Sequence, residues 1–118
     1  MTEHEHQVEL VRWSRLAAGR YPDLLKLFAV PNGGLRNAIV AKKLKAEGVV
    51  AGVPDLILPV AKNGYHGLFI ELKTEKGKAS PAQKHRIDQL NADGYLAAIC
   101  FGWLDATVVL KNYLESNQ

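Results

Sequence analysis

Cysteine is almost absent from this sequence, since Cys100 is the only one among 118 residues. A single cysteine excludes an internal disulfide and fits a reducing compartment, and the apolar run around Cys100 predicts a buried, inert thiol. Long apolar stretches are also lacking: no run reaches the roughly 18 residues typical of a membrane-spanning helix, and no signal peptide is recognisable. We therefore expect a soluble, cytoplasmic protein with no membrane partner.

A strong excess of one charge sign is lacking as well. The 15 Lys and Arg residues against 12 Asp and Glu give a formal net charge of +3 and an isoelectric point of about 9.1. This mild balance permits a polyanionic partner without identifying one. The apolar fraction of 47% supports a packed core and excludes a disordered chain. Residues 1–118 suffice for one compact domain but not for two.

The charged residues best placed to take part in a reaction lie in two short motifs, Gly52-Val53-Pro54-Asp55 and Glu71-Leu72-Lys73. An apolar run follows the first motif at residues 56–58, and another leads into the second at residues 68–70. Both runs are typical of buried strands. Because a buried strand has little use for unpaired charge, the charges at the strand ends indicate a site.

Two carboxylates brought together by strand pairing form an oxygen site that suits Mg²⁺ or Mn²⁺. Lys73 lies two residues after Glu71, so both side chains fall on one face of the strand. Two acids, a metal ion and a fixed ammonium are the components that hydrolyse a phosphodiester. The alternative is an ordinary surface salt bridge, which Glu71-Leu72-Lys73 alone would favour. The upstream Pro54-Asp55, with a hairpin between the motifs, favours the metal site.

The hairpin between the motifs sets a geometric condition on this site. Asn63-Gly64 predicts a two-residue turn. An unbroken register from that turn would put Asp55 opposite Leu72, on the face away from Glu71. The two acids can share a metal ion only if the loop has an odd length or a bulge lies between the turn and Asp55. Pro59, which has no N–H donor, is a suitable place for such a bulge.

A helix is expected over residues 3–18, with an inward stripe at about 100° per residue. Glu3 and Gln7 extend this stripe, whereas Glu5 falls on the opposite face. An inward acid needs a cation, a metal-bound water or a helix N-terminus as its partner, which makes Glu3 a candidate site residue. A frayed, solvated chain end is an equally good interpretation of Glu3.

Two loops offer contacts to a phosphate backbone. The glycine pair in loop 31–36 would let backbone N–H groups approach a phosphate, although a plain turn explains it too. The loop 74–79 is polar and basic. Lysines on the helix expected over 37–47 fit a solvated face as well as a DNA backbone. The candidate nucleic-acid-binding residues in the two loops are Asn32, Gly33, Gly34, Arg36, Lys76 and Lys78.

Capping signals predict the helix that follows. Ser80 suits the N-cap, Pro81 the first helical position and Gln83 the capping box, which accounts for Gln83 without any catalytic role. His4 and His6 have no third metal ligand at a suitable spacing and are expected to be exposed. The other expected elements are a short helix and strand over 24–30, strands over 55–60, 67–73 and 95–101, and a last helix beginning at Asp105.

The order of these motifs resembles the VRR-NUC family of the PD-(D/E)XK nuclease superfamily. The resemblance covers nearly the whole chain, from Glu3 to Leu114, and its most specific pieces are Gly52 to Asp55 and Glu71 to Lys73. It implies an α/β fold with a PD-(D/E)XK nuclease-like core, in which helices flank a central mixed β-sheet, and one VRR-NUC domain over residues 1–118.

The resemblance also implies a function, that of a metal-dependent DNA endonuclease similar to Holliday junction resolvases. Such an enzyme would be a homodimer from a bacterial or phage-infected cell, reading DNA shape. The alternatives are a catalytically inactive DNA-binding module of the same fold and, more remotely, a protein-interaction domain. The implied residues are Asp55, Glu71 and the Leu72 backbone carbonyl for Mg²⁺ or Mn²⁺, Lys73 as the catalytic lysine, Gln83 and Glu3 (or Glu5) beside them, and Gln7 in support.

Overall fold

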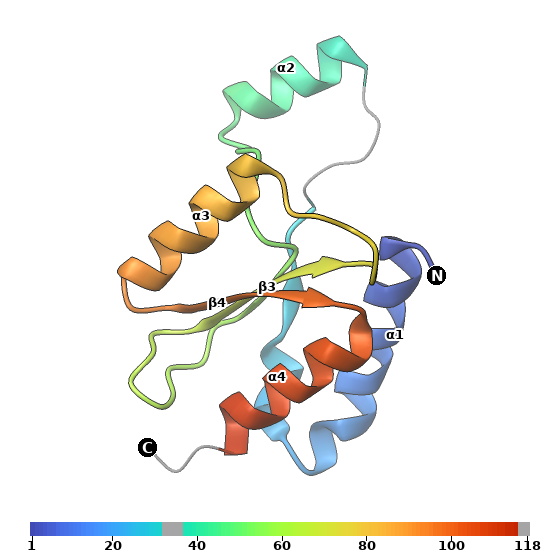
Figure 1. Cartoon of the computed structure of the whole chain (residues 1–118), viewed down its shortest axis with the longest axis vertical. Helices are drawn as coiled ribbons and strands as arrows, with labels where there is room; N and C mark the ends of the chain where they lie inside the picture. Colours follow the sequence, from blue (N-terminus) through green and yellow to red (C-terminus); the bar gives the residue numbers. More distant parts are fainter. Residues whose placement is uncertain (32–36, 116–118) are drawn as a thin grey trace.

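The computed structural model describes residues 1–31 and 37–115, which form a four-stranded sheet with helices on both faces (Figure 1). The strand order is β1-β2-β3-β4, with antiparallel pairing except between β3 and β4, which are parallel. The expected mixed-sheet α/β fold is thereby confirmed. The strands are β1 (Phe28–Ala29), β2 (Leu56–Leu58), β3 (Leu68–Lys73) and β4 (Leu96–Phe101).

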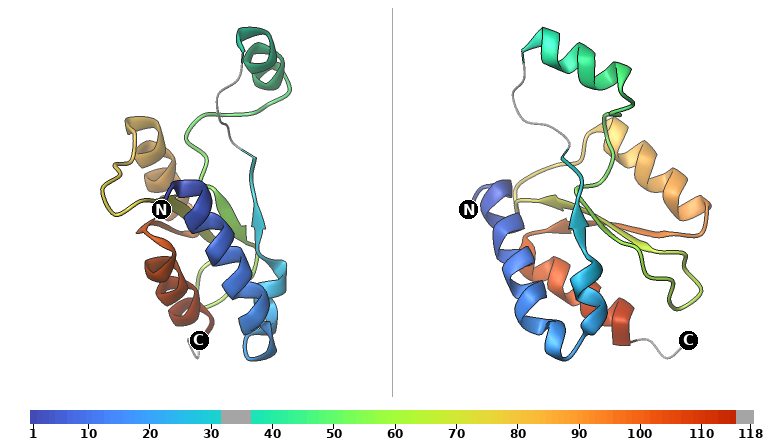
Figure 2. Two further views of the ribbon diagram at one scale, coloured as in Figure 1. Left: turned by 90° about the vertical axis from the view of Figure 1, so that its right-hand side faces the viewer. Right: turned by 180° about the vertical axis from the view of Figure 1, so that it is seen from behind.

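The helices divide between the two faces of the sheet. Figure 1 views the sheet from its β4 edge, with α3 above it and α4 and α1 below. α2 stands away from the body (Figure 2) and buries no residue. None of the helices within residues 1–31 and 37–115 is long and apolar enough to cross a membrane. The helices are α1 (Glu3–Leu16), α2 (Ala38–Ala46), α3 (Pro81–Ala92) and α4 (Trp103–Glu115), with short 3₁₀ turns at Ala17–Gly19 and Pro22–Lys26.

The core lies between the sheet and the pair α1 and α4. Leu68, Ile70 and Leu72 of β3 are buried there against leucines of both helices. Burial of each such side chain stabilises the fold by about 1.5–3 kcal/mol. Cys100 is also buried in this core, and burial raises the pKa of its thiol to about 12, as expected for an inert cysteine. The alternate residues of β3 therefore face α3, and these include Glu71 and Lys73.

A bulge in the β2–β3 hairpin meets the geometric condition set by the sequence. The turn pairs Lys62 with Tyr65, and positive φ angles at Asn63 and Gly64 make it the expected two-residue turn. Paired residue numbers add to 127 at this turn but to 126 in the strands, where Leu58 pairs with Leu68. Three residues, 59–61, thus oppose two, 66–67, as in a bulge.

The bulge moves Asp55 to the level of Glu71. The strand register, extended by one residue beyond the Leu56–Ile70 pair, sets the two acids opposite each other. The bulge begins at Pro59, the central residue of a three-residue turn in which the Val60 N–H donates to the Leu58 carbonyl at 2.9 Å. β2 is consequently shorter than the strand predicted over 55–60. The prediction of a bulge between the turn and Asp55 is confirmed.

Helix boundaries follow the capping residues with one error. Asn37 caps α2, and Ser80 with Gln83 forms the predicted capping box of α3. The prediction that the last helix begins at Asp105 is wrong, because α4 begins at Trp103, directly after the turn at Gly102. The Asp105 carboxylate instead accepts the Phe101 N–H at 3.0 Å, inside the first turn of the helix.

The prediction of an exposed His6 is also wrong, whereas His4 is exposed as expected. His6 is only 3% exposed, and its Nδ1 accepts the Trp103 N–H at 3.0 Å. It thereby satisfies one of the unpaired donors at the start of α4 and ties α1 to that helix. The overlooked signal is spacing, since His6 lies four residues before the buried Leu10 and so belongs to the inward stripe.

Candidate active site

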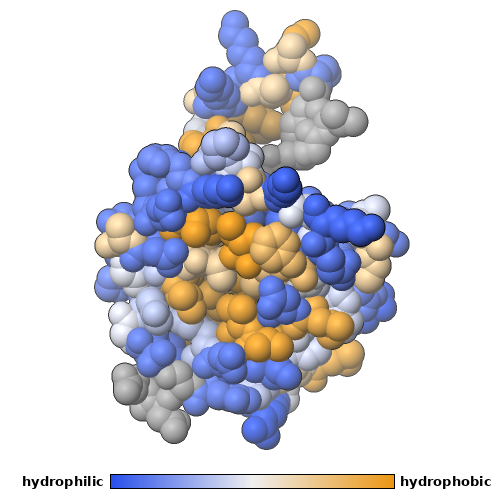
Figure 3. Space-filling model, viewed as in Figure 1, coloured by the Kyte–Doolittle hydropathy of each residue, from blue (hydrophilic) through white to orange (hydrophobic). Residues whose placement is uncertain are grey.

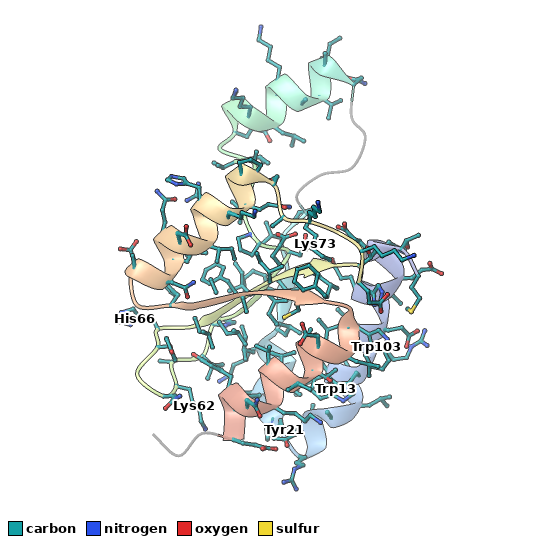
Figure 4. The ribbon with its side chains drawn as sticks, in the orientation of Figure 1. Trp13, Tyr21, Lys62, His66, Lys73 and Trp103 are labelled. Carbon is teal, nitrogen blue, oxygen red and sulfur yellow. The ribbon has the colours of Figure 1, made fainter. Side chains whose placement is uncertain are left out.

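Asp55, Glu71 and Lys73 converge at one end of the sheet. Asp55 Oδ2 accepts the Leu72 N–H at 2.8 Å, which fixes the acid beside β3. Lys73 Nζ lies 3.6 Å from Glu71 Oε2, and both side chains are buried, with 8% and 2% of the residues exposed. Figure 4 shows Lys73 on the side of the sheet that α3 covers, well away from Lys62 in the hairpin.

Burial gives the Glu71 carboxyl group an unusual proton affinity. Desolvation is the largest cause that raises its pKa, to about 8, and repulsion by Asp55 adds to it. Lys73 opposes this rise without cancelling it. The protonated form of Glu71 is also favoured because it can donate a hydrogen bond toward Asp55. A cation bound between them would replace that proton.

Gln83 connects α3 to this pair. Its Nε2 donates to Glu71 Oε2 at 3.2 Å, while its Oε1 accepts the Ser80 N–H at 2.8 Å in the capping box. The Gln83 side chain therefore caps α3, as predicted, and at the same time contacts the candidate active site. Gly52 permits this approach, because a Cβ at this position (φ +87°) would lie 2.7 Å from the Ala82 carbonyl oxygen in the first turn of α3.

The start of α1 contributes Glu3. Its Oε2 lies 4.0 Å from Lys73 Nζ, and its side chain is half exposed. Glu5 is engaged elsewhere, since it forms the capping box of α1 with Thr2, and this hydrogen bond lowers its pKa. Of the two acids considered from the sequence, Glu3 is the one that the fold brings to the lysine.

The residues present fit a divalent cation. Within the described part of the chain, Glu71 Oε1 is buried and has no hydrogen-bond donor, which is costly for an acid unless a cation binds it. No group of three or more His, Cys, Asp or Glu side chains that could hold a metal occurs in residues 1–31 and 37–115. The site thus offers two carboxylates, and other oxygen ligands would come from the backbone and water, as is common for Mg²⁺.

A groove of about 980 Å³ opens beside the site, between α1 and the chain that follows β1. Asp55 and Leu72 line it at the end of the sheet, together with Glu3 and Gln7 of α1. Sequence reasoning assigned no role to the two arginines of its wall, Arg12 and Arg15. Helical spacing could have identified them, because it places both arginines on the same face of α1 as the groove-lining residues of the preceding turns.

The expected nucleic-acid contacts are only partly described. Lys76 and Lys78 are exposed in the loop between β3 and α3, directly after Lys73. The predicted contacts at Asn32, Gly33, Gly34 and Arg36 lie outside the described residues.

The fold and the Asp–Glu–Lys cluster define an α/β domain of the PD-(D/E)XK nuclease-like class. A family model described as the VRR-NUC domain matches residues 2–103. A solved structure described as a VRR_NUC domain protein superposes with a TM-score of 0.84 at 34% identity, covering 98% of this chain and 89% of that chain. No protein of curated function matches significantly. The chain belongs to the VRR-NUC family, a nuclease-type family, which confirms the resemblance seen in the sequence.

Proposed function

We propose that this protein is a Mg²⁺- or Mn²⁺-dependent endonuclease that hydrolyses phosphodiester bonds of DNA. The observation that carries the proposal is the buried Glu71 oxygen without a donor, held beside Lys73 and beside Asp55, which lines the adjoining groove. The buried Glu71 carboxyl group, repelled by the half-buried Asp55, is costly to the fold, and binding a divalent cation would offset that cost.

Asp55, Glu71 and the Leu72 backbone carbonyl would hold the cation. When bound, it would stabilise charge on the phosphate oxygens and lower the pKa of a coordinated water. The Leu72 N–H holds Asp55 by Oδ2, and Gln83 holds Glu71 by Oε2, so both carboxylates are fixed before a ligand arrives. Such preorganisation avoids reorientation of the ligands during the reaction.

Lys73 would orient the attacking water or neutralise the charge that develops on the phosphate. Its Nζ lies between two acids, 3.6 Å from Glu71 and 4.0 Å from Glu3, which supports a fixed position for this group. Glu3 would hold this ammonium from α1, and Gln7, one turn later, would support the same wall. The lone buried Cys100 supports a reducing compartment, the cytoplasm of a bacterial or phage-infected cell.

A homodimer acting on branched DNA is the finer form of this proposal. The face shown in Figure 3 carries a continuous apolar area over β4 and the adjoining helices, and β4 is an edge strand. Phe101, Leu104 and Val108 are 45%, 64% and 50% exposed in this region. A twofold pairing through such a surface would supply two identical sites for two nicks. Light scattering with junction DNA tests it, and a strict monomer would favour a single-nick enzyme.

The deciding experiment is cleavage of a panel of DNA structures, including nicked, flapped and four-way junction DNA, with and without divalent metal. We expect nicking in Mg²⁺ or Mn²⁺ that disappears with a chelator. Binding of the same DNA without cleavage in any metal would instead identify a catalytically inactive DNA-binding module. RNA versions of the same substrates show whether the sugar matters.

A further inference from the structure

We propose that the groove beside α1 binds the nucleic-acid strand next to the cleaved phosphate, with Arg12 and Arg15 as its phosphate contacts. This inference rests on the proposed function and adds to it the path of the substrate. The groove is continuous with the site, because Asp55 and Leu72 form part of its wall.

One face of α1 forms the opposite wall. His4, Val8, Arg12 and Arg15 all line the groove and succeed one another at spacings of four, four and three residues. Such spacing keeps side chains on one side of a helix. The acids that line the groove, Glu3 and Asp55, both belong to the metal end, whereas both arginines lie in the last turns of α1. The wall therefore changes from a cation-binding end to an anion-binding end.

Both arginines are available to a ligand. The Arg12 side chain is 64% exposed, and it forms an ion pair with Glu9 on the same helix at 3.2 Å, a weak type of contact. Arg15 is exposed and makes no ion pair with any residue in the described ranges. Apolar side chains, Val8, Val11 and Val30, also line the groove and suit sugars and base faces.

The length of the helix predicts the extent of the contact. Glu3 to Arg12 and Glu3 to Arg15 correspond to about 13 and 18 Å at 1.5 Å per residue. A duplex strand lying along the groove advances about 3.4 Å per phosphate, so the arginines would meet phosphates roughly four to five nucleotides from the cut. A substrate that ends closer than this on that side should not benefit from them.

The test compares wild type with Arg12→Ala/Arg15→Ala by fluorescence anisotropy in Ca²⁺, using duplexes that extend two to eight base pairs on each side of the cleavage position. Loss of two phosphate contacts should reduce the slope of log K against log salt by about 1.8 and weaken binding on the order of tenfold to a hundredfold at 0.1 M salt. Wild type should gain affinity once one side exceeds about five nucleotides, and the variant should not.

A matched control removes the same charge elsewhere. Lys26→Ala/Lys62→Ala also lowers the net charge by two, and Lys26 has a 60% exposed side chain paired with Asp23 three residues away, as Arg12 is with Glu9. We expect wild-type affinity from this control and recovery of the slope in Arg12→Lys/Arg15→Lys.

Three results would overturn the proposal. One is an arginine variant that binds and cleaves like wild type, which leaves the nuclease function intact. The second is an equal loss in the lysine control. The third is dissociation of a dimer by the arginine substitutions without a change in salt slope, which would make the groove an interface between copies. Failure of the proposed nuclease function would give a different result: wild type would still bind longer duplexes more tightly but would cleave none of them.

Discussion

Replacement of Glu71 by glutamine should stabilise the metal-free protein at neutral pH. The fold holds this acid buried beside Asp55, which raises its pKa from the ordinary 4.5 to about 8. Each pH unit between these values corresponds to about 1.4 kcal/mol. At pH 7 the raised pKa of Glu71 therefore lowers the free energy of unfolding by up to about 3 kcal/mol, compared with a carboxyl group whose pKa is the same in the folded and unfolded chain. Glutamine has the same shape and carries no charge.

The sign follows from proton linkage. Because the pKa is raised in the folded state, the fold binds more protons than the unfolded chain between pH 4.5 and 8. Wild-type stability is therefore highest below this window and falls as pH rises through it. The free energy of unfolding of Glu71→Gln should match that of wild type near pH 5 and exceed it by about 2–3 kcal/mol at pH 7. The loss of one partner acid for Lys73 keeps this gain from being larger. For a chain of this size that is about 10 °C in melting temperature.

Urea or thermal unfolding in a chelator at pH 5, 7 and 8.5 measures this effect. Addition of Mn²⁺ should stabilise wild type, by about 2.7 kcal/mol at one hundred times the dissociation constant, and leave Glu71→Gln unchanged. Glu47→Gln, on an exposed residue at the end of α2, is the control and should follow wild type throughout. If Glu71→Gln shows the wild-type pH profile in the chelator, the buried-pair reasoning is refuted.

Three further substitutions separate the metal site from its supports. Asp55→Ala should abolish cleavage in Mg²⁺ while DNA binding in Ca²⁺ survives, and full activity would remove Asp55 from the site. Gln83→Ala should lose about 1 kcal/mol through the capping box and, in addition, lower kcat, whereas a stability loss without a kcat change would leave Gln83 purely structural. Gly52→Ala should destabilise by about 2 kcal/mol or more in chemical unfolding because its Cβ meets backbone, while Gly19→Ala, with open space, should be nearly neutral.

Local signals predicted most of the secondary structure. Ser80, Pro81 and Gln83 identify the start of α3, and Asn63-Gly64 identifies the hairpin turn, because each acts through the backbone of its immediate neighbours. The core strands were equally visible as apolar runs. The candidate site was predicted for the same reason, since its three main residues adjoin two strands joined by one short hairpin.

Contacts between distant segments could not be predicted in this way. Helical spacing marks His6 as facing inward, but no local pattern predicts its hydrogen bond with Trp103 at the start of α4, 97 residues later in the chain. The start of α4 at Trp103 depends on the same contact, since His6 accepts its N–H, whereas Asp105 alone is an ordinary capping signal. The groove wall formed by Arg12 and Arg15 likewise exists only once α1 lies against the chain after β1.

The bulge at residues 59–61 links local sequence to the site. A two-residue turn at Asn63-Gly64 imposes a register in which Asp55 and Glu71 occupy opposite faces, and one additional residue reverses the face of everything beyond it. Pro59 interrupts the ladder where that residue enters, and the Tyr113 hydroxyl donates to the Val60 carbonyl at 2.6 Å, which satisfies a bulge acceptor from the core. The meeting of the two acids therefore depends on a proline and a tyrosine that do not touch them.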